Sequence, residues 1–156
     1  MYYFLRKDFD LLQQRIARVC DQIKETGAEI GRSCQEGSDS YHDNFAYEEG
    51  ERQQKMHSRQ LVELLRIQGV VQIIIPTAKN EKVSIGKRVR YRDVDAKEEK
   101  TIVIGSYLTF DSDSVSYNTP LARILVGGSV GELRDGKIGK KEHHFEIIEI
   151  SMPSEV

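Results

Sequence analysis

The chain has 156 residues, of which 38% are hydrophobic and 31% are charged, and its formal net charge is -2 at pH 7. This length can hold one large or two small domains, and the nearly balanced charge excludes a protein that binds nucleic acid through bulk positive charge. Only two cysteines occur, and no apolar stretch approaches membrane-spanning length, so a reduced, cytoplasmic protein without a membrane partner is expected.

The first predicted element is a long helix that begins near Phe9. Apolar or small side chains recur from Phe9 to Ile30 at alternating intervals of three and four residues. This spacing places them in one narrow stripe, which suits a helix that packs against a single partner helix. A turn is expected at residues 37–40, where glycine, serine and aspartate cluster.

A second helix is expected over residues 44–71, which contain no proline and are rich in strong helix formers. It carries leucines at the same seam spacing and returns antiparallel to the first helix, so residues 1–75 are predicted to form a helical hairpin. Toward the turn its seam positions become polar or small, and we expect looser packing there. These positions are His57, Gln54, Gly50 and Tyr47.

Acidic side chains concentrate around the predicted turn. Residues 33–51 include six acids and no Lys or Arg, and basic residues such as Arg52 and Lys55 follow directly. Acids are also common at helix starts, where they cap the helix and interact favourably with its dipole. The pattern is therefore also consistent with acids that only stabilise the start of the second helix. The functional interpretation is a weak Mg²⁺ site that a partner completes. Carboxylate oxygens are ligands that Mg²⁺ prefers, but this segment has too few of them to surround the ion. His42 is interpreted as a solvent-exposed turn residue in preference to a ligand.

Residues 76–156 are predicted to form a small antiparallel β-rich domain with one short helix, which makes the whole chain α+β. Asn118 or Thr119 can cap this helix, and Pro120 suits its first turn. Asp135 and Gly136 have the composition of a two-residue hairpin turn. Acids and bases balance in this half, which favours a protein-docking platform. The predicted strands are 87–91, 100–107, 114–117, 130–134 and 144–151.

Two segments resemble the Gre family of bacterial transcript cleavage factors, which includes GreA and GreB. The first contains Asp39, Asp43, Asn44 and Tyr47 and is similar to the family's acidic tip. The second, residues 115–127, reads Val-Ser-Tyr-Asn-Thr-Pro-Leu-Ala-Arg-Ile-Leu-Val-Gly and is similar to the family's Ser/Thr-Pro helix segment. The resemblance implies a coiled-coil hairpin at residues 1–75 and an FKBP-like polymerase-docking domain at residues 76–156.

The resemblance also implies the function of a transcription elongation factor that is not an enzyme alone. Such a protein would act as a monomer on RNA polymerase, with Asn118, Thr119 and Pro120 docking at the rim of the secondary channel. Asp39 and Asp43 would help the polymerase hold its second Mg²⁺ and orient the water that cuts the 3′ end of backtracked nascent RNA. No tightly bound cofactor is expected in the free protein.

The surrounding tip residues are assigned supporting roles by the same resemblance. Asn44 and Tyr47 would support the tip, while Arg52 and Lys55 would face RNA or polymerase. The family tip has Asp, two residues and then Glu-Asn, whereas three residues separate Asp39 from Asp43 here. An ångström of misplacement can reduce a rate about 100-fold, so a non-cleaving regulator in the same channel stays an alternative. Prolyl isomerase activity is disfavoured because a fold alone does not carry it, and an unrelated coiled-coil adaptor is the last alternative.

Overall fold

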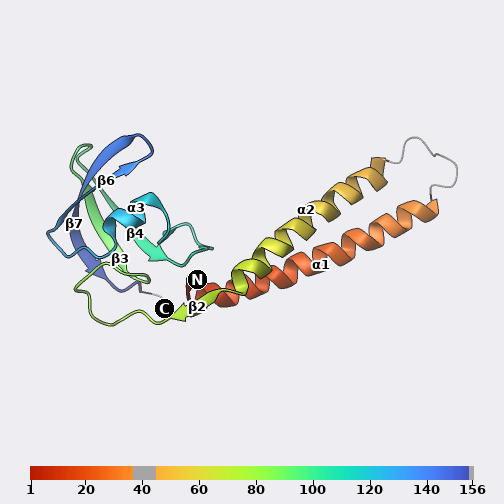
Figure 1. Ribbon diagram of the computed structural model, residues 1–156, viewed down its shortest axis with the longest axis horizontal. Helices are drawn as coiled ribbons and strands as arrows, with labels where there is room; N and C mark the ends of the chain where they lie inside the picture. Colours follow the sequence, from red (N-terminus) through yellow and green to blue (C-terminus); the bar gives the residue numbers. More distant parts are fainter. Residues whose placement is uncertain (37–44, 155–156) are drawn as a thin grey trace. The chain divides into compact units, whose positions relative to one another are not determined.

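The chain forms two compact units. Figure 1 colours them along the sequence, from red at the N-terminus to blue at the C-terminus. The computed structural model describes residues 1–36 and 45–154, with backbone only at 33–36. One unit comprises Met1–Asp10 and Val71–Val156, and the other comprises Leu11–Val70. The domains expected from the sequence, 1–75 and 76–156, assign the first ten residues to the hairpin. In the structure these residues group with the C-terminal unit, because their strand pairs there.

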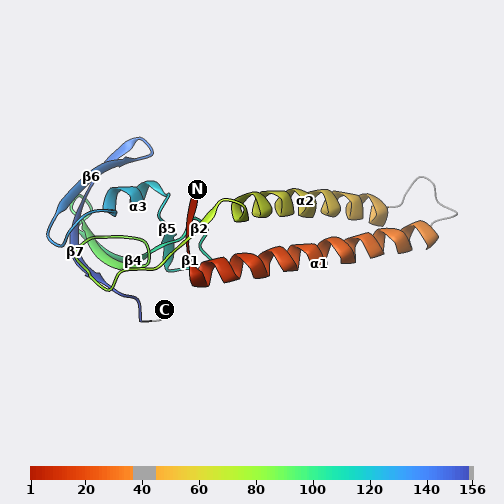
Figure 2. The same ribbon diagram turned by 60° about the horizontal axis from the view of Figure 1, so that its bottom comes forward.

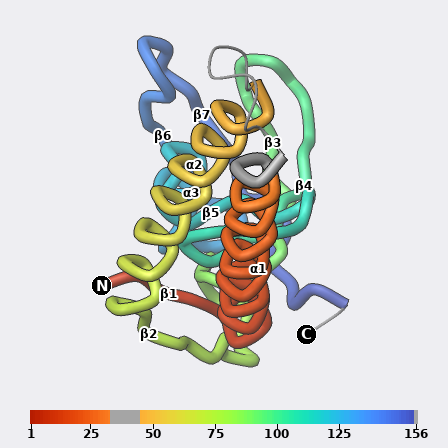
Figure 3. The backbone as a smooth tube through the Cα atoms, turned by 90° about the vertical axis from the view of Figure 1, so that its right-hand side faces the viewer, coloured from red at the N-terminus to blue at the C-terminus, as the bar shows by residue number. Residues whose placement is uncertain are grey.

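The unit Leu11–Val70 is a two-helix hairpin. Its arms are α1 (Arg6–Glu36) and α2 (Phe45–Gln68), which lie side by side in Figures 2 and 3. Leu12, Val19 and Thr26 are buried at intervals of one heptad along α1. On α2, Gly50 and Leu64 are buried two heptads apart. This burial matches the predicted seam. The second helix is shorter than predicted, since α2 ends at Gln68 and not at residue 71.

Two glycine contacts define the register of the hairpin. A Cβ atom built on Gly50 would lie 2.7 Å from Ile30 Cγ1, and one built on Gly27 would lie 3.9 Å from Gln54 Nε2. Residues early in α2 therefore face residues late in α1, which is the antiparallel arrangement. The helices approach closely at Gly50 because it has no side chain.

The seam becomes polar in the part of the hairpin nearer the turn, as the sequence predicts. Thr26 is only 5% exposed although it is polar. Among the described residues, Gln54 Oε1 and His57 Nδ1 are buried and have no hydrogen-bond partner in the protein. Because a buried unsatisfied polar atom costs about 1–3 kcal/mol, this polar part of the seam stabilises the hairpin less than the aliphatic part, which includes the buried Leu12 and Leu64.

The two seam glycines are expected to respond oppositely to alanine. Gly27→Ala should raise the free energy of unfolding of the hairpin by about 0.5–1 kcal/mol, because alanine reduces the entropy of the unfolded chain and nothing obstructs its methyl group. Gly50→Ala should lower it by about 1 kcal/mol or more, because the stiff Ile30 side chain has to move. Thermal unfolding followed by helical circular dichroism measures both, and equal stabilisation by the two substitutions would contradict the close approach at Gly50.

The other unit contains a five-stranded sheet with the order β5-β4-β3-β7-β6. All neighbouring pairs are antiparallel except β4 and β5, which run parallel. The fold class is confirmed, but the sheet is mixed and not wholly antiparallel. The connection between β4 and β5 is longer than a tight hairpin turn, so it can lead the chain back in the same direction. The strands are β3 (Arg88–Asp93), β4 (Glu98–Gly105), β5 (Ser114–Ser116), β6 (Leu133–Ile138) and β7 (Lys141–Ser151).

One short helix, α3 (Pro120–Leu125), packs against this sheet (Figure 1). Its buried residues Ala122 and Leu125 join a core cluster with strand residues such as Ile104 and Ile147. Apolar burial of this kind contributes about 25 cal/mol for each Å² removed from water. The helix is therefore fixed on the sheet by its apolar face, which leaves its other face exposed.

A second, two-stranded sheet was not predicted from the sequence. It pairs β1 (Tyr2–Leu5) in parallel with β2 (Val71–Ile74). Both strands are too short for periodicity to distinguish them from the neighbouring helices. Ser106 attaches β1 to the larger sheet, since Leu5 N donates to Ser106 Oγ at 2.8 Å and Ser106 Oγ donates to Asp8 Oδ2. Burial raises the pKa of the Asp8 carboxyl above its ordinary value, although the Ser106 hydrogen bond opposes this.

The hairpin turn predicted at Asp135 and Gly136 is wrong. Both residues lie inside β6, and the strand reverses instead after Ile138, where Gly139 has a positive φ of 65°. A Cβ atom on Gly136 would lie 2.5 Å from Ile124 Cγ1. Glycine therefore occurs at this strand position because α3 packs directly onto it. The local Asp-Gly pattern does not distinguish such packing from a hairpin turn.

None of the helices in the described part of the chain is both long enough and apolar enough to cross a membrane.

Candidate functional site

Three of the predicted tip residues lie outside the described residues. They are Asp39, Asp43 and Asn44. In the sequence they fall between the end of α1 and the start of α2. They are assigned to the connection between the arms only because α1 ends at Glu36 and α2 begins at Phe45.

Two described acids near the start of α2, Glu49 and Glu51, contact neighbours on the same helix. Tyr47 Oη donates to Glu51 Oε1 at 3.1 Å, and Arg52 Nη1 lies 3.1 Å from Glu49 Oε2. Lys55 is exposed one turn further along. Such exposed helix pairs contribute about 0.3–0.5 kcal/mol each. Tyr47 and Arg52 thus orient two of the carboxylates along the helix, which is a local role that the sequence did not assign to them.

No group of three or more His, Cys, Asp or Glu side chains capable of holding a metal ion occurs among the described residues. The predicted ligands Asp39 and Asp43 lie outside that part of the chain. Two carboxylates are suitable donors for Mg²⁺, which prefers oxygen ligands and keeps several waters. This donor set suits a metal that a partner also ligates.

The predicted docking segment forms the start of α3. Thr119 is the N-cap: its side chain accepts a hydrogen bond from Ala122 N at 3.3 Å and donates one to Ser116 O at 2.9 Å. Asn118 Oδ1 accepts a hydrogen bond from Arg123 Nη2. Thr119 therefore holds the helix start in shape, while the side chains of Asn118 and Pro120 are exposed.

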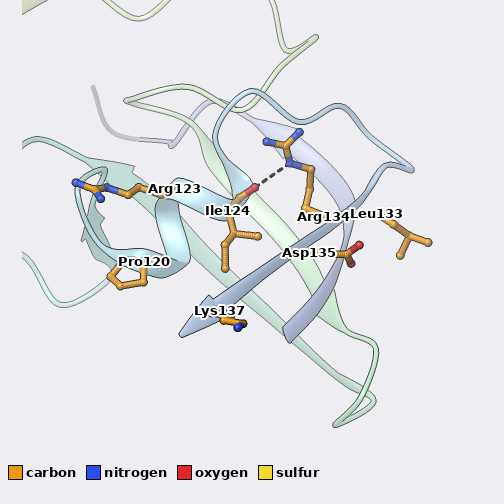
Figure 4. Close-up of a pocket in the computed structure, with 7 residues that line it drawn as sticks. All are labelled: Pro120, Arg123, Ile124, Leu133, Arg134, Asp135 and Lys137. Carbon is orange, nitrogen blue, oxygen red and sulfur yellow. Dashed lines mark hydrogen bonds between the residues drawn. The ribbon is translucent and has the colours of Figure 1, made fainter. Parts of the chain in front are cut away.

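Pro120 borders a pocket of about 620 Å³ between α3 and β6. Figure 4 shows residues of the helix on one side and residues of the strand on the other. Leu133 is 62% exposed at its edge. The lining is Pro120, Arg123, Ile124, Leu133, Arg134, Asp135 and Lys137.

Arg134 connects the two sides of the pocket and was missed by the sequence analysis. Its Nε donates to Ile124 O at 2.8 Å, drawn as a dashed line in Figure 4, and its Nη2 donates to Val126 O at 3.0 Å. Its Nη1 lies 3.0 Å from Glu132 Oε1. The guanidinium therefore satisfies two carbonyls at the end of α3. The only sequence signal for this contact is Gly136, whose missing side chain lets the helix approach the strand.

Asp135 also has a partner within the sheet. Its Oδ1 lies 2.6 Å from His144 Nδ1 on the neighbouring strand. The hydrogen bond to Asp135 holds the pKa of His144 above its ordinary value. This contact gives the surface residue His144 a defined place beside the pocket.

Comparison with known proteins gives the following matches. The family described as "Transcription elongation factor, GreA/GreB, C-term" matches residues 78–152. GreA of a Nitratiruptor species is 29% identical over 152 residues, covering 96% of this chain and 88% of that protein. GreA of Aliarcobacter butzleri is 30% identical over 111 residues, covering 69% of each. Among solved structures, GreA factor homolog 1 of Thermus thermophilus has a TM-score of 0.44 at 17% identity and covers 95% of this chain and 97% of that chain.

Proposed function

Since the chain belongs to the GreA/GreB family of transcription elongation factors, we propose that it binds RNA polymerase and stimulates the cleavage of backtracked nascent RNA. Members of this family are factors and not enzymes in their own right. The β-unit would dock at the rim of the secondary channel, and the hairpin would carry its acidic connection to the polymerase active site.

One observation carries the proposal: Asp39 and Asp43 fall in the sequence between the two arms of a long two-helix hairpin. Its first arm, α1, has 31 residues, which corresponds to a length of about 45 Å at 1.5 Å per residue. The hairpin has only a narrow apolar seam, so its length adds little to a core. A long arm with carboxylates at its end is suited to delivering them into a narrow channel.

The proposed chemistry belongs to Asp39 and Asp43. Mg²⁺ would supply Lewis-acid activation of the attacking water and stabilise the leaving oxygen. The two carboxylates would complete the ligand set that the polymerase begins and accept a hydrogen bond from the water. Arg52 and Lys55 follow on α2 and would face RNA or polymerase beside the acids.

The exposed start of α3 supports the docking part of the proposal. The cap at Thr119 and the ring of Pro120 fix this backbone before a partner binds, so little conformational entropy would be lost on docking. Asn118, Thr119 and Pro120 would form the polymerase-binding segment.

One sequence observation favours a second candidate function, that of a non-cleaving regulator. Three residues separate Asp39 from Asp43, one more than in the family's tip pattern, and the second acid is the shorter Asp. A tip that misplaces its carboxylates would still occupy the channel without stimulating cleavage. The protein would then regulate transcription as a non-cleaving secondary-channel factor.

The deciding experiment adds the purified protein to backtracked elongation complexes assembled with RNA polymerase from its own host. Appearance of short 3′ RNA fragments, dependent on Mg²⁺ and on the added protein, supports the cleavage function. Binding to the polymerase without fragments would establish the non-cleaving alternative. Absence of binding would contradict both.

Pro120→Ala is expected to weaken binding to RNA polymerase about fivefold, because a more flexible helix start loses about 1 kcal/mol more entropy on docking. The fold should stay intact, since the Thr119 cap and the buried residues of α3 are unchanged. Affinity is measured by a direct titration, with Pro153→Ala as the control because that proline lies outside α3 and β6. Equal affinities for the two variants would remove Pro120 from the docking segment.

A further inference from the structure

The residue directly before β3, Lys87, is a fully buried lysine. Its exposed fraction is 0%. The next residue, Arg88, pairs with Ser151 at the end of β7. Continuing this antiparallel register by one residue places Lys87 beside Met152. Because burying a charged side chain is costly unless it has partners, the contacts of Lys87 show what this position requires.

Three neutral atoms surround the amino group of Lys87. Its Nζ donates to the carbonyl oxygen of Thr77, to Asn80 Oδ1 at 2.9 Å and to Met152 Sδ at 3.0 Å. These acceptors match the three N–H groups of an ammonium. Lys87 forms no ion pair with any described residue, so the thioether, a weak acceptor, is one of only three partners of a buried cation. We call Lys87 and these three residues the lysine clasp.

The lysine clasp joins two segments that lie far apart in the sequence. Thr77 and Asn80 belong to the connection between β2 and β3, and both are exposed. Met152 follows the last residue of β7. In the described part of the chain, the backbone of residues 77–82 forms no hydrogen bond to the backbone of a strand. The position of this connection therefore depends on the side-chain contacts of Lys87.

Oxidation would affect Met152 differently from the other two methionines of the chain. Met1 is 78% exposed and Met56 is 57% exposed, so an oxygen added to either sulfur would lie in solvent. Met152 is half-buried, so a small oxidant can reach it, but its Sδ contacts Lys87 Nζ. An added oxygen that pointed toward Nζ would not fit into a contact of 3.0 Å, and one that pointed elsewhere would leave the sulfur a poorer acceptor. In either case Lys87 loses this partner in its present position.

We propose that Met152 is a site of reversible oxidation by peroxides and that its sulfoxide opens the lysine clasp. The sulfur lone pair attacks one oxygen of hydrogen peroxide: an S–O bond forms, the O–O bond breaks, and the departing hydroxyl takes the remaining proton and leaves as water. Sulfur loses two electrons and the peroxide gains them. A methionine sulfoxide reductase, with electrons from a thiol, reverses the step. The inference is independent of the function proposed above, because it concerns only the β-unit.

The first test compares two matched full-length variants, Met56→Leu and Met152→Leu, each of which keeps one internal methionine. Leucine is close to methionine in volume, so both should fold. Each is treated with hydrogen peroxide until mass spectrometry shows that its methionines are oxidised. Amide hydrogen exchange is measured before and after at Val83 and Gly86, whose N–H groups donate to Gly128 O and Ile104 O beside the clasp.

Oxidation of the Met56→Leu variant is expected to speed exchange at these two amides at least about 10-fold, because an open clasp permits local unfolding of the connection. Oxidation of the Met152→Leu variant should leave the same exchange nearly unchanged. The Ile147 amide, which donates to Glu132 O, serves as a reference and should not respond in either variant. Equal responses of the two variants, or equal acceleration at Ile147, would overturn the inference.

The second test asks whether the effect is reversible and passes through Lys87. Methionine sulfoxide reductases for both sulfoxide epimers, with dithiothreitol, should return the oxidised Met56→Leu variant to its slow exchange. When Lys87→Leu is added to Met56→Leu, oxidation should no longer speed exchange, because there is no clasp to open. Fast exchange that persists after reduction, or an undiminished response without Lys87, would contradict the proposal.

The wild type provides a measurement that does not depend on the folding of the Lys87 variant. In the folded protein, peroxide should oxidise Met152 at least about fivefold more slowly than Met56, because the N–H donor withdraws density from the sulfur lone pair and burial limits access. In urea the two rates should become equal. Equal rates in the folded protein would show that the Met152 sulfur is not held by Lys87, and the inference would fail.

Discussion

Replacing Asp39 and Asp43 together with Asn is expected to reduce RNA cleavage at least about 100-fold while changing polymerase affinity little. Asn keeps the size and turn preference of Asp but removes the negative charge that Mg²⁺ requires. An interaction that acts mainly in the transition state lowers the rate and leaves binding nearly unchanged. Cleavage is measured as short 3′ fragments released from backtracked complexes, and affinity is measured separately by titration. Asp43→Asn alone should be at least as damaging as Asp39→Asn, because Asp43 directly precedes Asn44 as the family's tip acid does.

The matched control for this experiment lies on the same hairpin. Asp21→Asn with Glu25→Gln removes the same charge from exposed positions of α1, so it reports any general electrostatic effect on channel binding. The control should cleave like the wild type. Equal cleavage by the Asp39/Asp43 variant and the wild type would rule out a catalytic role for these carboxylates, and a wild type that never cleaves would favour the non-cleaving regulator.

Arg134→Met is expected to lower the free energy of unfolding of the β-unit by about 3 kcal/mol. The substitution removes charge-assisted hydrogen bonds to the carbonyls of Ile124 and Val126, each worth about 1.5–3 kcal/mol. Methionine retains much of the aliphatic volume, so the loss should arise mainly from the polar contacts. Hydrogen exchange at amide groups of the five-stranded sheet measures this stability in the full chain.

The control for Arg134 is Arg123→Met on the exposed face of α3. Arg123 contacts Asn118 and, among the described residues, donates to no carbonyl at the helix end, so its replacement should change stability little. Arg134→Met should also weaken polymerase binding, because α3 is then held less firmly against β6. Similar stabilities of the two variants would contradict the bridging role of Arg134.

The agreement between sequence and structure is best along the hairpin. Positions such as Leu12, Val19 and Thr26 face the seam because helical periodicity is a local property that a sequence displays directly. The polar layer at Gln54 and His57 was predicted for the same reason, since it follows from projecting one register along α2. The start of α3 was also predicted, because Thr119 and Pro120 act on their immediate neighbours.

The disagreements involve contacts between distant segments. Strands β1 and β2 pair although the whole hairpin separates them in the sequence, and four-residue strands carry too little periodicity to be recognised singly. Gly136 was assigned to a turn because Asp-Gly is a strong local turn signal. Its place in β6 is determined instead by Ile124, which occupies the space that a Cβ atom would fill.

By itself, the sequence determined the helical hairpin, the acidic segment around Asp39 and Asp43, the capped start of α3 and the resemblance to the Gre family. These features depend on periodicity, composition and short-range capping, all of which act between neighbours in the chain. Only the tertiary structure decided that β6 lies against α3, that Arg134 joins them, and that Arg123 and Lys137 border one pocket. Such relations depend on strand order and on packing between residues far apart in sequence, for which local propensity carries no information.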